Sequence, residues 1–123
     1  MHFGLTEEQE MIVSTVRSFV EKEIYPHEDL VERTGEVPPD LAQEIKQKVI
    51  DLGFYACNFP EEVGGAGLSH LDFTLVEREL GRGSMALTHF FGRPQNILMA
   101  CTPNSASGIC CLPCGASGWM PWP

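Results

Sequence analysis

The sequence predicts an all-α fold: a small bundle of four to five helices followed by a disordered C-terminal tail. Apolar residues recur every three or four positions in several separate stretches, which is the spacing of one face of a helix. These stretches are bounded by residues that typically start or stop helices. Strand signals are marginal, because the one short apolar run, "FYACNF" at 54–59, reads as extended or turn-like.

The first predicted helix covers residues 6–25. Thr6 is a suitable N-cap, and Gln9 stands at the capping-box position three residues later. One apolar stripe runs along this helix, formed by Ile12, Val16, Phe19, Val20 and Ile24. Pro26 is expected to end the helix.

A second helix is predicted to begin at Pro39 or Asp40 and to end at Gly53, a residue suited to the left-handed C-terminal position. Its apolar positions are Leu41, Ile45, Val49 and Leu52. A third helix is predicted to start at Ser69 and to run to Gly81.

A fourth helix is expected after Ser84, which could cap it. Its apolar residues are Met85, Leu87, Phe90 and Phe91. Pro94 either kinks this helix or opens a further one that runs toward Cys101.

The composition narrows the classes of partner and location. The net charge of -9 and the pI near 4.7 argue against nucleic acid or an anionic membrane, since both attract clustered Lys and Arg. No apolar run is long enough to predict a membrane span, and the N-terminus does not resemble a secretory signal. Five cysteines give no even disulfide framework. We therefore expect a cytoplasmic protein.

Two motifs could indicate a ligand site. "GGAG" at 64–67 resembles part of a phosphate loop, but no Lys follows it and no strand precedes it, so a tight connection between helices is favoured. "CCLPC" at 110–114 could offer three thiolates, whereas a structural zinc site needs four ligands. The four histidines are scattered, and no metal site is predicted.

A catalytic constellation is also not predicted. Cys57 lies among aromatic residues without a local base or cation, which favours a small buried side chain over a nucleophile. Glu77 and Glu79 are two apart and would not share a helix face, so they are not expected to form an acid–base pair.

The firmest signal of chain organisation is the distribution of charge. All 25 charged residues lie between Glu7 and Arg93, and the 30 residues from Pro94 to Pro123 contain none. About a quarter of residues are charged in an ordinary chain. A change in composition after Arg93 is therefore indicated.

Three stretches together carry a resemblance to a known family. These are "LTEEQEMIVSTVRSFVEKEIYP", "DLGFYACNFPEEVGGAGLSHLDFTLVERELGRGS" and "FFGRPQNILMACT". Their order and spacing resemble the start of an acyl-CoA dehydrogenase over about residues 3–102. The resemblance implies that residues 1–102 are the N-terminal all-helical domain and that residues 103–123 are a non-homologous tail.

The resemblance also implies a chemistry. Complete members of this family bind FAD, remove a proton from Cα of an acyl-CoA with a glutamate base, and pass a hydride from Cβ to the flavin. Both the flavin contacts and the glutamate would lie beyond this chain, so no catalytic or cofactor-binding residue is predicted here. Acyl-CoA is the implied partner, and complete members oligomerise. By position, Thr88, His89, Gly92 and Asn96 would line one wall of the acyl pocket; alternatively, they only pack the bundle.

The tail after about Thr102 is expected to be an out-of-frame ending. Codons for Cys and Trp begin with T, and a T moved to second position always encodes an apolar residue. In the shifted frame, residues 103–123 can be recoded as "EQRERYLLPAVRGERMDALA", which restores charge and a plausible helix. A gene whose shifted frame stops quickly, or encodes nothing similar to the family, would contradict this interpretation.

Three functional hypotheses follow. The first is a truncated dehydrogenase domain that is catalytically silent alone. The second is a stand-alone helical interaction module, in which exposed apolar faces recruit a partner or promote self-association. The third, a cysteine-rich metal or redox peptide, would show zinc binding that Cys110→Ser or Cys114→Ser abolishes.

Overall fold

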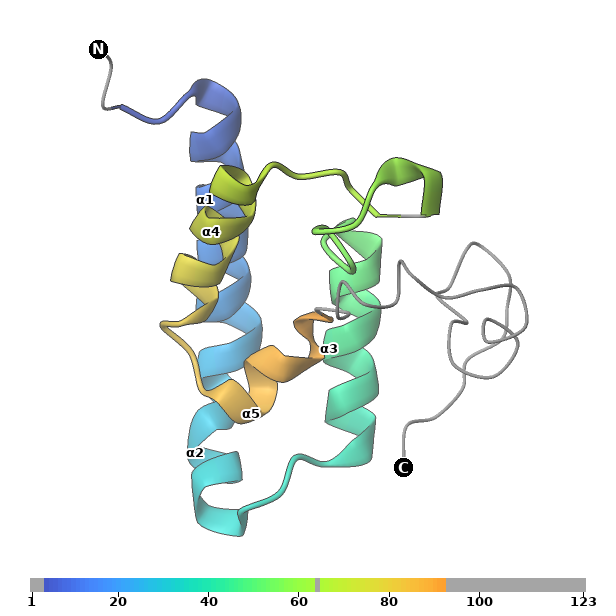
Figure 1. Ribbon diagram of the computed structural model, residues 1–123. Helices are drawn as coiled ribbons and strands as arrows, with labels where there is room; N and C mark the ends of the chain where they lie inside the picture. Colours follow the sequence, from blue (N-terminus) through green and yellow to red (C-terminus); the bar gives the residue numbers. More distant parts are fainter. Residues whose placement is uncertain (1–3, 64, 93–123) are drawn as a thin grey trace, which may run out of the picture.

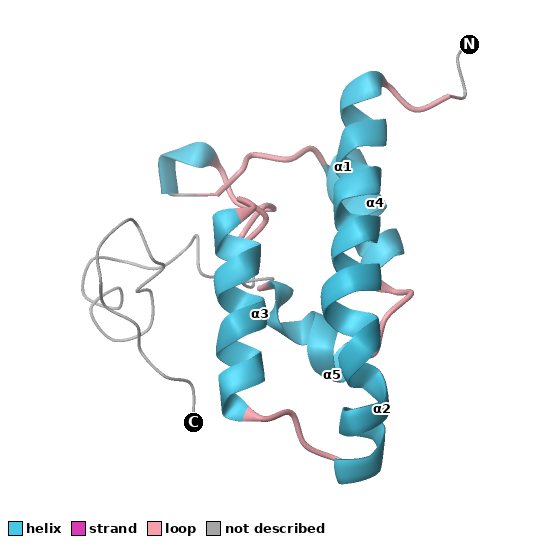
Figure 2. Cartoon of the chain, turned by 180° about the vertical axis from the view of Figure 1, so that it is seen from behind, coloured by secondary structure: helices cyan, strands magenta, loops and turns pink. Residues whose placement is uncertain are grey.

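The computed structural model of the 123-residue chain describes residues 4–63 and 65–92. Within these ranges the predicted all-α class is confirmed, because every regular element there is a helix (Figure 2). The elements in order are α1 (Glu7–Phe19), the π-helix η1 (Val20–Ile24), α2 (Tyr25–Thr34), α3 (Pro39–Asp51), the 3-10 helix η2 (Glu61–Val63), α4 (His70–Leu80), α5 (Met85–Thr88) and the 3-10 helix η3 (His89–Phe91). The predicted helix after Pro94 and the tail 103–123 lie outside the described residues.

The helices form two flanks with a short helix between them (Figure 1). α1 and α2 make one long helix through η1, and α4 packs along α1. These two run in the same direction, because Gln9 bonds Asp72 near their starts and Arg17 bonds Glu79 near their ends. α3 returns on the other flank, and α5 lies between α3 and the long helix.

The predicted end of the first helix at Pro26 is wrong. The helix continues to Thr34, where Gly35 takes a left-handed conformation with φ +72°. A proline inside an α-helix removes one hydrogen bond and clashes with the carbonyl four residues earlier. The π-helical turn avoids this, because the Tyr25 N–H bonds back five residues to the Val20 carbonyl and Pro26 falls in the first turn of α2.

Most of the other predicted helix ends agree with the structure. Thr6 and Gln9 form the capping box in both directions. Gly53 after α3 has φ +77°, and the Ser69 side chain accepts a hydrogen bond from the Asp72 N–H at the start of α4. The predicted cap at Ser84 is different, because that side chain makes no capping hydrogen bond to α5.

The core joins the helices other than η2, mostly through their predicted apolar stripes; Val31 in α2 was not predicted. Phe91 lies at its centre, with its ring edge-on to Phe19 at 5.5 Å and beside Phe54 at 5.8 Å between centroids. The buried cluster consists of Val16, Phe19, Val20, Ile24, Val31, Ile45, Val49, Val76, Leu80, Leu87 and Phe91. Among the described residues, no helix is both long and apolar enough to cross a membrane.

Candidate functional site

The segment α5–η3 contains two of the four predicted pocket-wall residues, Thr88 and His89, and a third, Gly92, follows it directly. Thr88 ends α5 and is buried, whereas His89 begins η3 and is exposed, with its ring edge-on to Phe90. The structure therefore directs these two neighbours differently: Thr88 contributes to the bundle interior and His89 lies at its surface.

Gly92 closes the described part of this segment. It has φ +72°, and a Cβ there would lie 2.1 Å from a ring carbon of Tyr55. Its carbonyl accepts a hydrogen bond from the Ala56 N–H. Only glycine fits this close approach, which pins the end of η3 to the turn after α3. Asn96, the fourth predicted residue, lies outside the described residues.

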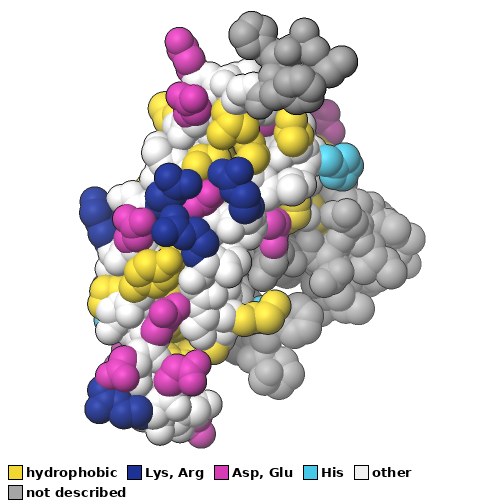
Figure 3. Space-filling model, turned by 90° about the vertical axis from the view of Figure 1, so that its left-hand side faces the viewer, with side chains coloured by type: hydrophobic (Ala, Val, Ile, Leu, Met, Phe, Trp, Pro, Cys, Tyr) yellow, Lys and Arg dark blue, Asp and Glu magenta, His cyan; other side chains and the backbone are white. Residues whose placement is uncertain are grey.

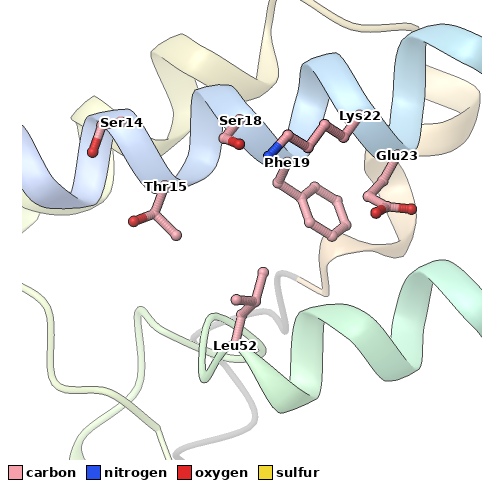
Figure 4. Close-up of a pocket in the computed structure, with 7 residues that line it drawn as sticks. All are labelled: Ser14, Thr15, Ser18, Phe19, Lys22, Glu23 and Leu52. Atoms are coloured by element: carbon pink, nitrogen blue, oxygen red, sulfur yellow. The ribbon is translucent and has the colours of Figure 1, made fainter.

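An open groove of about 430 Å³ lies between α1 and the end of α3 (Figure 4). It is lined by Ser14, Thr15, Ser18, Phe19, Lys22, Glu23 and Leu52. Phe19 lies both in the groove and against the segment α5–η3, because its ring also contacts Phe91 in η3. Of the predicted wall residues that the structure describes, Thr88, His89 and Gly92, none lines the groove.

A buried carboxylate joins α1 to α4. Glu79 is 2% exposed and accepts hydrogen bonds from Arg17, Arg78 and Arg82 at 2.9–3.2 Å. Figure 3 shows Lys and Arg side chains gathered with acidic ones on the face that these helices form. The hydrogen bonds from Arg17, with those from the other two arginines, hold the pKa of Glu79 at about 2, against the opposing effect of burial. The sequence spacing of Glu77 and Glu79 bears only on whether they form an acid–base pair, and it did not predict the three arginines around Glu79.

The "GGAG" loop is a connection between helices within the described residues. The Gly65 N–H donates to the Pro60 carbonyl and the Gly67 N–H donates to the Phe59 carbonyl. A phosphate loop needs such amides to point at the anion. The amides of Gly65 and Gly67 instead tie the loop back onto residues 59–60, which favours the structural interpretation.

The comparison with known families decides the identity of this helical arrangement. The family model described as "Acyl-CoA dehydrogenase, N-terminal domain" matches residues 6–107. The chain belongs to the acyl-CoA dehydrogenase family. The resemblance inferred from the three sequence stretches is thereby confirmed.

Curated acyl-CoA dehydrogenase relatives agree with this assignment. The chain is 38% identical over 91 residues to the "Probable acyl-CoA dehydrogenase YngJ" of Bacillus subtilis (strain 168), which covers 72% of this chain and 23% of that protein. It is 37% identical to the "Benzylmalonyl-CoA dehydrogenase" of Aromatoleum aromaticum, over 71% of this chain and 22% of the relative. It is 38% identical to the mitochondrial "Short-chain specific acyl-CoA dehydrogenase" of Bos taurus, over 64% of this chain and 18% of the relative.

The chain thus spans about a quarter or less of the length of these acyl-CoA dehydrogenase relatives. No solved structure matches it.

Among the described residues of this acyl-CoA dehydrogenase domain, the glycine loop and the arginines around Glu79 do not fit a flavin site. A dinucleotide needs donors for its pyrophosphate, usually loop amides or unengaged basic side chains. Here the Gly65 and Gly67 amides bond their own loop, and the guanidinium groups of Arg17, Arg78 and Arg82 surround Glu79. We derive no step through FAD from these residues.

Cys57 and the possible metal ligands among the described residues of this acyl-CoA dehydrogenase domain give no candidate site. Cys57 is buried, and burial raises the pKa of its thiol to about 11, which suits the expected packing role rather than nucleophilic attack. In the part of the chain that the structure describes, no group of three His, Cys, Asp or Glu residues could hold a metal ion. The "CCLPC" motif lies outside that part.

Proposed function

We propose that residues 1–102 are the N-terminal domain of an FAD-dependent enzyme that dehydrogenates acyl-CoA thioesters between Cα and Cβ. The observation that carries the proposal is the family match over residues 6–107, joined to relatives whose names specify acyl-CoA dehydrogenases. Acyl-CoA is the proposed ligand, and Thr88, His89, Gly92 and Asn96 are the proposed contribution to its pocket. The domain limit at residue 102 and the out-of-frame tail at 103–123 belong to this proposal.

The 123-residue chain alone is proposed to be catalytically silent. FAD and the glutamate base of the family are proposed to reside in regions that this chain does not contain. The engagement of the Gly65 and Gly67 amides with their own loop, and of three arginines with Glu79, supports this separation. Purified chain is therefore expected to carry no flavin absorption and to turn over no acyl-CoA; either activity would contradict the silent-fragment part of the proposal.

The domain assignment is tested in a chimaera. Residues 6–92 of this chain replace the corresponding segment of the bovine short-chain enzyme, with the unmodified bovine enzyme as the control. We expect a flavin-loaded chimaera that dehydrogenates at least one substrate in a panel of straight and branched acyl-CoA thioesters. A folded, flavin-loaded chimaera without any turnover would contradict the proposed function.

A second function, a helical interaction module, is favoured by the exposed apolar side chains. Those exposed are Leu5, Met11, Tyr25, Leu30, Leu52, Leu71 and Met85. If these side chains face other domains in a complete enzyme, the isolated chain is expected to self-associate without a defined stoichiometry. Size-exclusion chromatography with light scattering checks this: a sharp dimer or trimer favours the module, and a polydisperse species favours the orphaned domain.

A further inference from the structure

The helix α5 is too short to determine its own position. It contains four residues and continues as the three-residue helix η3, whereas helices of this length are not stable by themselves in water. Its orientation must therefore come from tertiary contacts: Leu87 and Phe91 are buried in the core, and further contacts hold the two ends of the segment. Gly92 fixes the far end against Tyr55 and Ala56, as described above.

The near end is held by a residue from another helix. The Ser84 N–H donates to Oε1 of Glu28 in α2 at 2.5 Å, across 56 positions of sequence. The Ser84 side chain itself makes no capping bond. Glu28 thus accepts from the N-cap amide of α5, the bond that the Glu or Gln at position N3 of a capping box makes and that Leu87 at this position cannot make, and its negative charge is favourable at a helix N-terminus.

The face of the long helix that carries Glu28 also sets how far the start of α5 lies from that helix. A Cβ on Gly83 would lie 2.9 Å from Ile24 and 3.4 Å from Val20, so the backbone at Gly83 rests directly on these side chains. Ile24 and Glu28 are four residues apart and share one helix face. This face reaches Gly83 and Ser84 because the π-helical turn carries the helix past Pro26.

We propose that Glu28 is a positioning residue for the acyl-pocket wall. By capping α5 from α2, it sets the orientation of the segment that contains Thr88 and His89. This inference rests on the proposed function for the part that concerns the pocket. The carboxylate at residue 28 does not touch the substrate; it acts through the backbone of Ser84.

Amide hydrogen exchange on the 123-residue chain tests the positioning itself. In Glu28→Ala, exchange at Ser84, Leu87 and Thr88 is expected to rise at least roughly tenfold, because a hydrogen bond to a charged acceptor is lost. Glu28→Gln keeps an acceptor oxygen and is expected to restore most of the protection. The matched control is Glu32→Ala, which removes the same charge from an exposed site on α2.

The amides of Val16 and Val76 serve as internal references for global unfolding. A rise confined to α5 in Glu28→Ala, with rescue in Glu28→Gln, supports the proposal. Unchanged exchange at Ser84, or an equal rise at the two reference amides, overturns it.

The consequence for the pocket is tested in the bovine chimaera. Glu28→Ala is expected to raise KM for acyl-CoA about tenfold, because a displaced wall misplaces the substrate. The effect on kcat is expected to be smaller, since the flavin and base come from other domains, and Glu28→Gln is expected to restore KM. An unchanged KM together with selective exchange overturns the pocket part alone. If the chimaera is already inactive without this substitution, that result counts against the proposed function. The hydrogen-exchange test of the positioning role is unaffected, because it uses the 123-residue chain.

Discussion

Replacing Glu79 with alanine is expected to destabilise the chain by about 2–3 kcal/mol, the range of a lost hydrogen bond to a charged group. The carboxylate is buried and accepts hydrogen bonds from three guanidinium groups. Without it, Arg17, Arg78 and Arg82 keep their mutual repulsion and lose the group that offsets it. The α1–α4 contact would then lose its central polar link, and α4 would separate more easily from the long helix.

Urea unfolding followed by circular dichroism measures this loss of stability. The matched control is Glu10→Ala, which removes an exposed carboxylate from α1 and is expected to change the free energy of unfolding by less than about 0.5 kcal/mol. Glu79→Gln should lie between the two, because the amide keeps the size and one acceptor oxygen. A Glu79→Ala variant that is as stable as the Glu10→Ala control would contradict this role for the cluster.

The pH dependence of stability gives an independent measure of the same carboxylate. The pKa of Glu79 falls from 4.5 to about 2 in the folded chain. A carboxylate with a depressed pKa stabilises the fold above its unfolded pKa and loses that contribution as pH falls through its folded pKa. The contribution, roughly 3 kcal/mol, is therefore complete above about pH 4.5 and disappears toward pH 2. The stability difference between wild type and Glu79→Gln should shrink over that interval; a constant difference would contradict the assignment.

Local sequence rules predicted most of the fold, because helix caps act over three or four residues. Thr6 with Gln9, Ser69 with Asp72, and Gly53 each lie next to the helix end that they determine. The predicted cap at Ser84 and the predicted helix end at Pro26 were the exceptions. The rule that proline ends a helix assumes α-helical hydrogen bonds, and one π-helical turn changes that pattern without any distinctive residue to announce it.

The candidate sites were harder to predict because their partners are distant in sequence. Glu79 pairs with Arg17 across 62 positions and Glu28 bonds the backbone of Ser84 across 56. Nothing local distinguishes Glu28 from the exposed glutamates around it. A weak signal did exist for Glu79, since the "RELGR" run places two arginines within three residues of it and the apolar Val76 and Leu80 beside it. A charged residue in that setting needs a buried partner.

Replacing Gly65 with alanine is expected to destabilise the chain by about 3 kcal/mol, the upper end of typical overpacking effects. A Cβ at this position would lie 2.0 Å from the backbone oxygen of Phe59. Backbone cannot move aside as a flexible side chain can, so the bonds from Gly65 to Pro60 and from Gly67 to Phe59 would be broken. The connection between α3 and α4 would open, and the buried ring of Phe59 would lose its cover.

Gly67 and Gly4 serve as controls that distinguish the steric clash at Gly65 from the general effect of replacing a glycine with alanine. Gly67 has φ +62° but an ordinary Cβ contact at 3.5 Å, so Gly67→Ala should cost only the backbone strain, about 1 kcal/mol. Gly4 has nothing within 4 Å, and Gly4→Ala should leave the melting temperature unchanged. Thermal melts of the three variants should therefore rank Gly65→Ala lowest and Gly4→Ala highest. Inorganic phosphate should not change that order, because the amides of Gly65 and Gly67 already bond the chain. Two results would contradict the structural role of these glycines: a Gly65→Ala variant with the same melting temperature as Gly4→Ala, or a wild-type protein that phosphate stabilises through this loop. Either result would mean that the glycines serve a ligand rather than the connection between α3 and α4.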